Sequence, residues 1–413
     1  GYKIMNLIEK GLMYFKSEGL SYTLKKTTHK IYKEIKKIPS IVIEKLYAEK
    51  VVIQLANIFK GKDVYIIIPC IDWNIPLYQR PHQIASELAK RQNAMVLFIP
   101  DQYEYDNFPI YKVVNDNLWL FSNRIIEKLD KLLKHANSKV VFMSWTRHAD
   151  LLYKFQYDKL VYEYIDDMSL FYYYNEQMEE THRRLMRQSD ITICTATKLY
   201  KTALKYTDKA ILNENAGDYE FFKNNRNAPI ANELVDIIDK YDCVIGYYGC
   251  LAYWFDYSTI CEVAKRRKKW LFVLIGYEFD HSFEVIKRQK YANIIHIPAQ
   301  PYHRLPSFVS GFDIQTIPFV INEVTKSTSP VKLFEYMASG KPIVTSKLPE
   351  CLKYESALIY EDANEFIERV EYLSKLDKSD KYYHKLEKEA LENAWASRID
   401  KILESLKMED KND

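Results

Sequence analysis

Short, almost wholly apolar runs recur along the chain, and they constrain its fold more than any other feature. The first two span residues 64–68 (VYIII) and 95–99 (MVLFI), and a stretch with helical spacing of apolar residues lies between them. Strands that are apolar at every position are typical of a parallel sheet covered by helices on both faces. Similar runs occupy residues 118–121, 139–143, 160–165, 191–195 and 210–213. The sequence therefore predicts a doubly wound α/β domain over residues 63–222.

The same pattern begins again in the second half of the chain. Apolar runs separated by helical stretches occupy residues 243–248, 270–275, 294–297, 314–317 and 342–345. They predict a second domain of the same class over residues 243–381, and the Asn-rich segment 223–242 is interpreted as the linker. Residues 382–413 are predicted to form a C-terminal helix that can cross back to the first domain. Two such domains in tandem favour a ligand site between the carboxyl ends of their strands.

The N-terminal segment, residues 1–62, differs from the rest in charge and is predicted to be a basic amphipathic helical extension. It holds 13 Lys, five Glu, no Arg and no Asp, whereas the whole chain carries a net charge of only +3. A nucleic-acid-binding protein usually has a basic surface on its folded domain, so no nucleic-acid partner is expected. Two interpretations stay open: a solvated helix packed on the main body, and a peripheral membrane contact or docking arm through residues 1–60.

Cysteine usage and hydropathy point to the cell interior. The six cysteines form no C-x-x-C pair and have no histidine cluster beside them, which indicates reduced thiols and no zinc site. Neither a cleavable signal peptide nor an apolar run long enough to span a bilayer is recognised. The expectation is a cytoplasmic protein, with contact to the inner face of the membrane if the basic segment binds lipid.

The most informative segment for chemistry is residues 322–346 (NEVTKSTSPVKLFEYMASGKPIVTS). A polar loop leads to Pro330, which suits the first turn of a helix, and Gly340 ends that helix. The start of a helix presents unpaired N–H groups and partial positive charge, so it can hold a diphosphate. Within the helix, Glu335 can accept hydrogen bonds from two ribose hydroxyls if it faces the cleft. A helix with a polar cap and an inward glutamate is the plain structural alternative.

Several segments resemble one family. Residues 329–344 (SPVKLFEYMASGKPIV) resemble the donor-site motif of retaining glycosyltransferase family four. Residues 244–257 (VIGYYGCLAYWFDY) resemble the first strand and loop of that family's C-terminal domain, in particular in bacterial capsule, teichuronic-acid and surface-polysaccharide transferases. Residues 73–89, 162–167 and 293–319 are similar to the same branch. The resemblance covers about residues 63–360 and depends on the order and spacing of these pieces.

The resemblance implies a GT-B fold, in which two Rossmann-like domains face a cleft. It also implies a nucleotide-diphosphate sugar as donor, a glycan or lipid-linked glycan as acceptor, and transfer of a hexosyl group with retention. No metal and no further cofactor are expected, and the sequence contains no Asp-x-Asp triplet of the kind that holds a metal–diphosphate complex. A site of this class must stabilise the charge that grows on the departing diphosphate.

The candidate site residues fall into three groups. The donor-binding candidates are Gly249, Pro298, Tyr302, Lys326, Ser327, Thr328, Ser329, Pro330, Lys332 and Glu335. The catalytic candidates are His148, Asp166, Asp167 and Lys326. The acceptor-binding candidates are Arg80, His82, Trp254 and Asp256. For most of them a structural role stays open beside the functional one: a helix cap for the aspartates, core packing for Trp254, and a surface salt bridge for Arg80.

Two departures from the family pattern keep other functions open. Ser327 stands where the family places a first glutamate, and the loop after the first strand of the C-terminal domain, residues 250–256, lacks the usual Arg and Lys. The alternatives are a catalytically inactive scaffold in a glycan-assembly complex and a GT-B nucleotide-sugar epimerase. A Rossmann dehydrogenase is not expected, because residues 69–73 after the first strand lack G-x-G-x-x-G.

Overall fold

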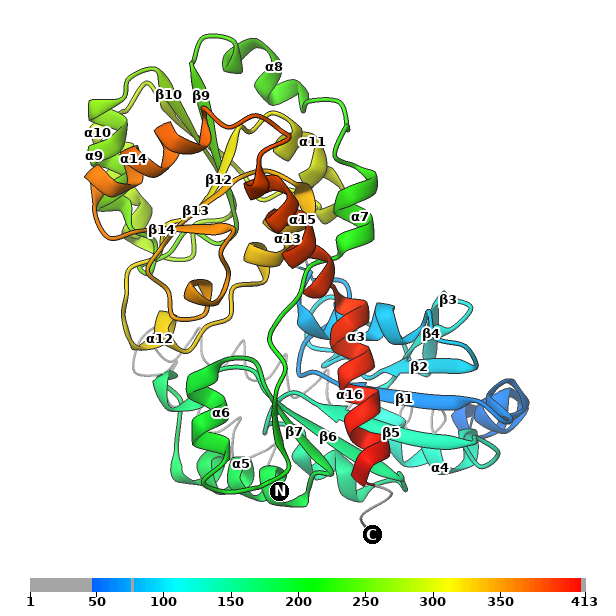
Figure 1. Cartoon of the computed structure of the whole chain (residues 1–413). Helices are drawn as coiled ribbons and strands as arrows, with labels where there is room; N and C mark the ends of the chain where they lie inside the picture. Colours follow the sequence, from blue (N-terminus) through cyan, green and yellow to red (C-terminus); the bar gives the residue numbers. More distant parts are fainter. Residues whose placement is uncertain (1–46, 76–77, 410–413) are drawn as a thin grey trace, which may run out of the picture.

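The computed structural model describes residues 47–75 and 78–409 and consists of two α/β domains, one above the other in Figure 1. The expected character of residues 1–46 therefore lies outside the described part. Residues 47–55 are helical and continue into the 3-10 helix η1 (Ala56–Phe59). Ala48, Val52 and Phe59 are fully buried in the core of the N-terminal domain. This end of the basic segment thus packs on the body of the protein.

The N-terminal domain is built on an eight-stranded sheet in the order β3-β4-β2-β1-β5-β6-β7-β8. Every neighbouring pair is parallel except the edge hairpin of β3 with β4. The strands are β1 (Asp63–Ile68), β2 (Ala94–Phe98), β3 (Tyr111–Asn115), β4 (Leu118–Phe121), β5 (Ser138–Met143), β6 (Lys159–Tyr164), β7 (Ile191–Cys194) and β8 (Ala210–Leu212). The helices are α3 (Arg80–Leu88), α4 (Leu129–Leu132), α5 (Glu176–Gln188) and α6 (Thr197–Ala203).

The predicted doubly wound α/β class is confirmed. In β1 every residue after Asp63 is buried, as a central strand with helices on both faces requires. Strand β3 was not predicted, because it is an edge strand whose side chains are mostly exposed and which carries no apolar run.

The C-terminal domain has a six-stranded, wholly parallel sheet in the order β11-β10-β9-β12-β13-β14. Its strands are β9 (Cys243–Tyr248), β10 (Trp270–Ile275), β11 (Ile294–Ile297), β12 (Ile314–Ile317), β13 (Ile343–Ser346) and β14 (Ala357–Tyr360). Its helices are α9 (Tyr257–Arg266), α10 (Glu284–Gln289), α11 (Leu305–Ser310), α12 (Glu323–Lys326), α13 (Val331–Ser339) and α14 (Ala363–Leu373).

The chain crosses between the domains earlier than the segment 223–242 interpreted as the linker. Helices α7 (Tyr219–Asn224) and α8 (Asn232–Ile238) contribute Phe222 and Leu234 to the core of the C-terminal domain. The crossing precedes Tyr219, where a Cβ on Gly217 would lie 2.6 Å from the carbonyl oxygen of Phe334 in α13. The Asn-rich composition thus marks the surface loop between two short helices, and tertiary packing assigns both helices to the second domain.

A second crossing returns the chain to the N-terminal domain. The C-terminal segment forms two helices, α15 (Lys381–Glu392) on the C-terminal domain and α16 (Trp395–Glu409) on the N-terminal domain, the latter drawn in red beside α3 in Figure 1. The two crossings are hydrogen-bonded, since Gly217 donates to Asn393 and accepts from Trp395 through backbone atoms. The domains are therefore joined by one paired connection.

Candidate functional site

The start of α13 lies at the junction of the domains. Pro330 is its N-cap, and the preceding Ser329 is buried. The carbonyl oxygen of Ser329 accepts a 2.7 Å hydrogen bond from the amide of Asn215, which belongs to the first crossing. The hydroxyl of Ser329 is buried and has no hydrogen-bond partner among the described residues. The helix thus begins beside the connection between the domains, with an unused hydroxyl at its cap.

The Glu335 carboxylate lies at the centre of a small buried network. It accepts a 2.9 Å hydrogen bond from the Tyr248 hydroxyl and a 3.0 Å hydrogen bond from the Tyr302 hydroxyl. Burial raises the pKa of Glu335, and the two tyrosine hydroxyls oppose that shift. Each oxygen of the Glu335 carboxylate thus accepts a hydrogen bond from one tyrosine hydroxyl. Two neighbouring hydroxyls of a ribose could donate to the same two oxygens.

Tyr302 connects this network with the N-terminal domain. Its ring centre lies 5.2 Å from that of Tyr78 and 5.1 Å from that of Phe221. Its hydroxyl also accepts a 3.4 Å hydrogen bond from the Gln83 amide in α3. The Glu335 carboxylate therefore faces the interface of the two domains and not bulk solvent.

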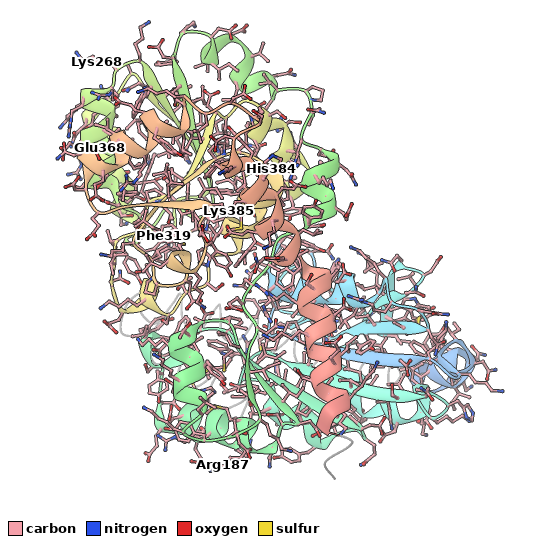
Figure 2. The ribbon with its side chains drawn as sticks, in the orientation of Figure 1. Arg187, Lys268, Phe319, Glu368, His384 and Lys385 are labelled. Atoms are coloured by element: carbon pink, nitrogen blue, oxygen red, sulfur yellow. The ribbon has the colours of Figure 1, made fainter. Side chains whose placement is uncertain are left out.

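Lys332 lies in the first turn of α13, beside the predicted phosphate position. Gly249, which follows β9, has a φ of 143°, and a Cβ there would lie 2.9 Å from Cε of Lys332. The Lys332 ammonium lies over the rings of Tyr247 and Phe319, 5.6 and 5.0 Å from their centres. Phe319 is labelled in Figure 2 on the part of its domain that faces the other one. Burial lowers the pKa of Lys332, and the charge of Glu335 opposes that shift. In the described part of the chain no carboxylate lies within ion-pair distance of the Lys332 ammonium.

Three other predicted donor-binding residues make contacts within their own domain. Lys326 is exposed and pairs with Glu323 at 2.9 Å, and its role at the diphosphate stays a prediction. The hydroxyls of Ser327 and Thr328 both donate to the carbonyl oxygen of Val324, because the tight end of α12 leaves that carbonyl within their reach. Pro298, just after β11, is exposed.

The two catalytic aspartates lie side by side after β6 but differ in environment. Asp167 caps the 3-10 helix η4 (Met168–Leu170) by accepting from Ser169, and it pairs with Lys198 at 3.3 Å. Asp166 is half-buried and has no hydrogen bond or ion pair among the described residues. Burial, followed by the charge of Asp167, raises the pKa of Asp166 to about 6. Asp166 is therefore the one of the pair with a free carboxylate suited to proton transfer near neutral pH.

His148 is held by a residue that the sequence analysis missed. Its Nε2 lies 2.7 Å from Oδ1 of Asp101, whose Oδ2 pairs with Arg147 at 2.9 Å. Asp101 follows β2, and His148 follows β5, at the same carboxyl edge of the sheet. Asp101 could have been found from the sequence, because it is an acidic residue shortly after the apolar strand β2. An Asp–His contact of this kind fixes the orientation of the imidazole.

The four acceptor-binding candidates all have partners within the protein. Arg80 is buried and pairs with Glu163 at 2.9 Å, while its guanidinium also donates to Asn215 in the crossing. The His82 ring is held between backbone groups of Trp73 and Gln79, and burial lowers its pKa.

Asp256 caps α9 by accepting from the backbone of Thr259, and Trp254 packs on Phe279. The side chains of all four candidates are therefore engaged within their own domains or in the connection. Their role at the acceptor stays a prediction.

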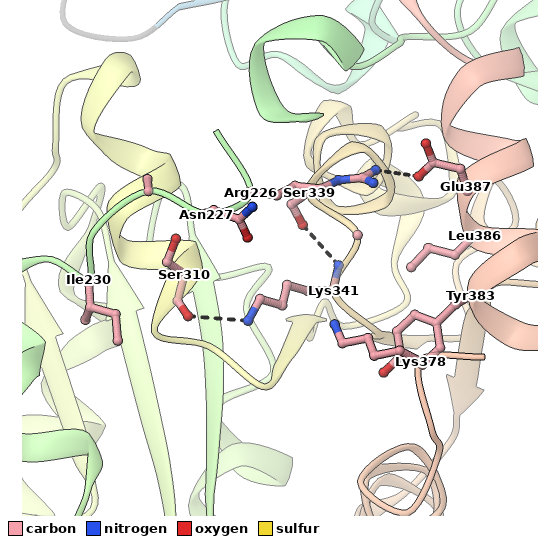
Figure 3. A pocket seen from close by; sticks show the side chains of 12 residues that line it. Arg226, Asn227, Ile230, Ser310, Ser339, Lys341, Lys378, Tyr383, Leu386 and Glu387 are labelled. Atoms are coloured by element: carbon pink, nitrogen blue, oxygen red, sulfur yellow. Dashed lines mark hydrogen bonds and ion pairs between the residues drawn. The ribbon is translucent and has the colours of Figure 1, made fainter. Parts of the chain in front are cut away.

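A cavity of about 610 Å³ lies at the opposite end of α13, around Gly340 (Figure 3). Arg226, Lys341 and Lys378 line it together with Glu387, which pairs with Arg226 at 2.6 Å. The Lys341 ammonium donates to the carbonyl oxygens of Ser310 and Phe312. None of the predicted site residues lines this cavity, and most of its cations are already bound to helix ends.

Over residues 47–75 and 78–409, no group of three or more His, Cys, Asp or Glu side chains is placed to hold a metal ion. Within the same residues, no helix combines the length and the apolar character that a membrane span needs.

Comparisons with known proteins agree with this architecture. Residues 258–404 match a family model described as glycosyl transferase-like. A Bacillus subtilis protein named as a teichuronic acid biosynthesis glycosyltransferase, TuaH, is 29% identical over 186 residues, which are 43% of this chain and 45% of that protein. The chain thus aligns with about half the length of this curated relative.

Solved structures extend the likeness to both domains. Sucrose-phosphate synthase of Thermosynechococcus elongatus superposes with a TM-score of 0.63 at 10% identity, over 85% of this chain and 100% of that one. HepE of Anabaena, in complex with UDP-glucose, gives a TM-score of 0.61 at 13% identity, over 84% and 99%. At such low identity these likenesses show the fold alone, and that fold is GT-B.

Proposed function

We propose that this chain is a glycosyltransferase of the retaining family-four type, moving a hexosyl group from a nucleotide-diphosphate sugar to a glycan or lipid-linked glycan in bacterial surface polysaccharide assembly. The glycosyl transferase-like match over residues 258–404 and the teichuronic-acid name of the Bacillus subtilis relative support this proposal. The reaction is proposed to need neither a metal nor a further cofactor. The proposed location is the cytoplasm, with the part of the basic segment before residue 47 as the membrane contact, since residues 47–59 pack on the N-terminal domain.

One observation carries the proposal: the cap of α13, the Lys332 ammonium and the Glu335 carboxylate are grouped at the domain interface. A helix start and a cation without an ion pair both favour a bound diphosphate. Glu335 lies just over one helical turn further along α13 and offers acceptor oxygens to ribose hydroxyls. Gly249 gives the space that Lys332 occupies, because a side chain there would meet it. The positive charge of Lys332 complements the diphosphate, and the Glu335 carboxylate complements the neutral hydroxyl donors of the ribose.

The proposed mechanism assigns separate work to the two domains. As the bond between the sugar and the diphosphate breaks, negative charge grows on the leaving group, and the α13 amides with Lys332 stabilise it. Asp166 takes the proton of the acceptor hydroxyl, since its carboxylate is free and its pKa is raised to about 6. His148, whose Nε2 is held by Asp101, accepts a hydrogen bond from a hydroxyl of the transferred sugar at its other ring nitrogen.

Calorimetric titration with UDP and UDP-glucose tests the donor site. Lys332→Gln is expected to weaken binding about tenfold or more, since a charge-assisted contact to phosphate is lost. Lys326→Gln is the matched control, because that lysine is exposed and already paired with Glu323, and it should bind as the wild type does. If the donor is not UDP-glucose, a thermal-shift screen of other nucleotide-sugars should identify the one that stabilises the protein. Absence of binding across the panel, or sensitivity of Lys326 in place of Lys332, would refute the site.

A catalytically inactive scaffold is the second candidate, and Ser327 favours it. The Ser327 hydroxyl donates to carbonyl oxygens of α12, so no carboxylate stands at this position to contact the transferred sugar. Donor binding without turnover, with any acceptor or with water, would support the scaffold. Conversion of the bound nucleotide-sugar into its epimer without acceptor would support an epimerase.

A further inference from the structure

Four aromatic rings form a continuous surface cluster on the N-terminal domain. Trp145 lies 5.4 Å from Phe171, Phe171 lies 5.5 Å from Tyr173, and Tyr173 lies 5.1 Å from Tyr172, all between ring centres. Tyr172 is 98% exposed and Tyr173 is 44% exposed, whereas Trp145 and Phe171 are half-buried and anchor the outer pair. We call these four residues the aromatic platform.

The platform lies at the carboxyl edge of the sheet, where ligands bind in doubly wound folds. Trp145 follows β5 and the other three rings follow β6, and these strands are parallel neighbours. Exposed aromatic surface is costly in water, so a cluster of this kind on a loop usually has a partner.

A chain of ion pairs connects the platform loop with the donor side. Asp167 pairs with Lys198 at 3.3 Å, and Lys198 pairs with Glu323 of the C-terminal domain at 3.1 Å. Glu323 begins α12, which leads directly into the cap of α13. The loop that carries the platform therefore faces the same domain junction as the proposed donor site.

Polar groups accompany the rings. Asp166 precedes the platform residues after β6 and has a free carboxylate, and Arg147 has a side chain that is 54% exposed. Both groups follow the carboxyl ends of the neighbouring strands β5 and β6, as the platform rings do. Rings beside a carboxylate and a guanidinium match a pyranose, whose C–H face is apolar and whose rim carries hydroxyls. A lipid surface would not be expected to favour the free carboxylate.

We infer that the aromatic platform, together with Asp166 and Arg147, is the subsite that holds the acceptor as a glycan chain. The inference rests on the proposed function and identifies its acceptor side. Tyr172 and Tyr173 stack on sugar rings beyond the reacting unit, and Asp166 lies at the end of the subsite nearest the β6 strand.

The test uses the full chain on an array of short neutral and uronate-bearing oligosaccharides. The wild type is expected to retain members of the array, and a Tyr172→Ala/Tyr173→Ala variant is expected to lose at least about tenfold in affinity. Tyr372→Ala is the matched control, since this tyrosine is 51% exposed on α14 of the other domain. The control variant should bind the oligosaccharides with the affinity of the wild type. Because Tyr172 is almost fully exposed, the platform variant should keep the wild-type circular dichroism spectrum.

Three outcomes overturn the inference: a wild type that retains no oligosaccharide, a platform variant that binds as the wild type does, and platform-dependent binding to phosphatidylglycerol vesicles that oligosaccharides do not displace. A parallel titration with UDP-glucose separates this failure from failure of the proposed function. If the platform variant still binds UDP-glucose, the proposed donor site is supported independently of the result on the oligosaccharide array. If the wild type binds glycans through Tyr172 and Tyr173 but binds no nucleotide, the glycan-binding role of the platform is supported and the proposed glycosyltransferase function is refuted.

Discussion

The Tyr302 hydroxyl donates a 3.0 Å hydrogen bond to the Glu335 carboxylate, and its ring packs on Tyr78 of the other domain. The carboxylate that we propose for the ribose is thus already bound by a residue in contact with both domains. A ribose diol and the tyrosine hydroxyls would use the same oxygens. Donor binding is therefore expected to be linked to the closeness of the two domains.

Glu335→Gln is predicted to weaken nucleotide binding about tenfold, because a neutral amide has one acceptor oxygen in place of two charged ones. Calorimetric titration with UDP measures the change. Glu371→Gln on the surface of α14 is the control, since its carboxylate pairs only with Arg267 at 2.7 Å. Equal affinities for UDP in the wild type and the Glu335 variant would remove the ribose role.

Asp166 is predicted to determine the acid limb of the pH–rate profile. A general base must be ionised, so kcat/KM should fall as the pH drops below about 6, the value to which burial raises its pKa. Asp166→Asn should lower kcat by about 10²–10⁴-fold and abolish this limb. An unchanged acid limb in the variant would assign the proton transfer to another group.

The same residue gives a prediction for stability. Because the folded-state pKa of Asp166 is raised above its ordinary value of 3.8, the fold favours the protonated form. The ionised carboxylate therefore destabilises the fold, and stability should decline as the pH rises from about 4 through about 6. Asp166→Asn should lack this decline and should be more stable at pH 7, by about 1 kcal/mol after allowance for solvent screening. Thermal unfolding of both proteins at pH 4 and pH 7 measures it.

Arg80→Met is predicted to destabilise the protein by about 3–5 kcal/mol, because it leaves the buried Glu163 carboxylate without its cation. Replacing both partners, as Arg80→Met with Glu163→Leu, should recover part of that loss, since no charge is then buried. Urea unfolding midpoints of the three proteins provide the comparison. A single variant as stable as the wild type would show that the pair is solvated.

Gly249→Ala is predicted to weaken UDP binding and to destabilise the fold only modestly, by about 1–3 kcal/mol for a side chain in this backbone region. Its φ of 143° disfavours a side chain, and the new Cβ would displace Lys332. Gly276→Ala should be more destabilising, because its Cβ would lie 1.8 Å from the carbonyl oxygen of Gly249. Titration with UDP and urea unfolding separate the two effects. Equal UDP affinity in Gly249→Ala would show that Lys332 does not bind phosphate.

Much of the fold was predictable from local pattern. The wholly apolar runs of β1 and β9 indicated covered parallel strands, and Pro330 with Gly340 marked the ends of α13. These signals are local, because burial on both faces and helix ends each depend on a few neighbouring residues. The polar edge strand β3 carried no such signal.

The site was only partly predictable. Residues of similar chemistry that lie close together along the chain, such as Asp166 and Asp167, or Lys326 and Lys332, receive different partners once the chain is folded. The contact of Asp101 with His148 joins residues 47 positions apart, so neither residue alone indicates it.

The sequence by itself determined the α/β class, the strands of both sheets other than β3 and β14, and the helix that follows Pro330, since each follows from periodicity and backbone preferences along the chain. Only the tertiary structure decided that Gly217 and Trp395 form one paired connection, that Arg80 is buried, and that Glu335 meets Tyr302 at the domain interface. The physical reason is that charge, burial and hydrogen bonding depend on which groups are neighbours in space, and folding brings together groups that are distant along the chain.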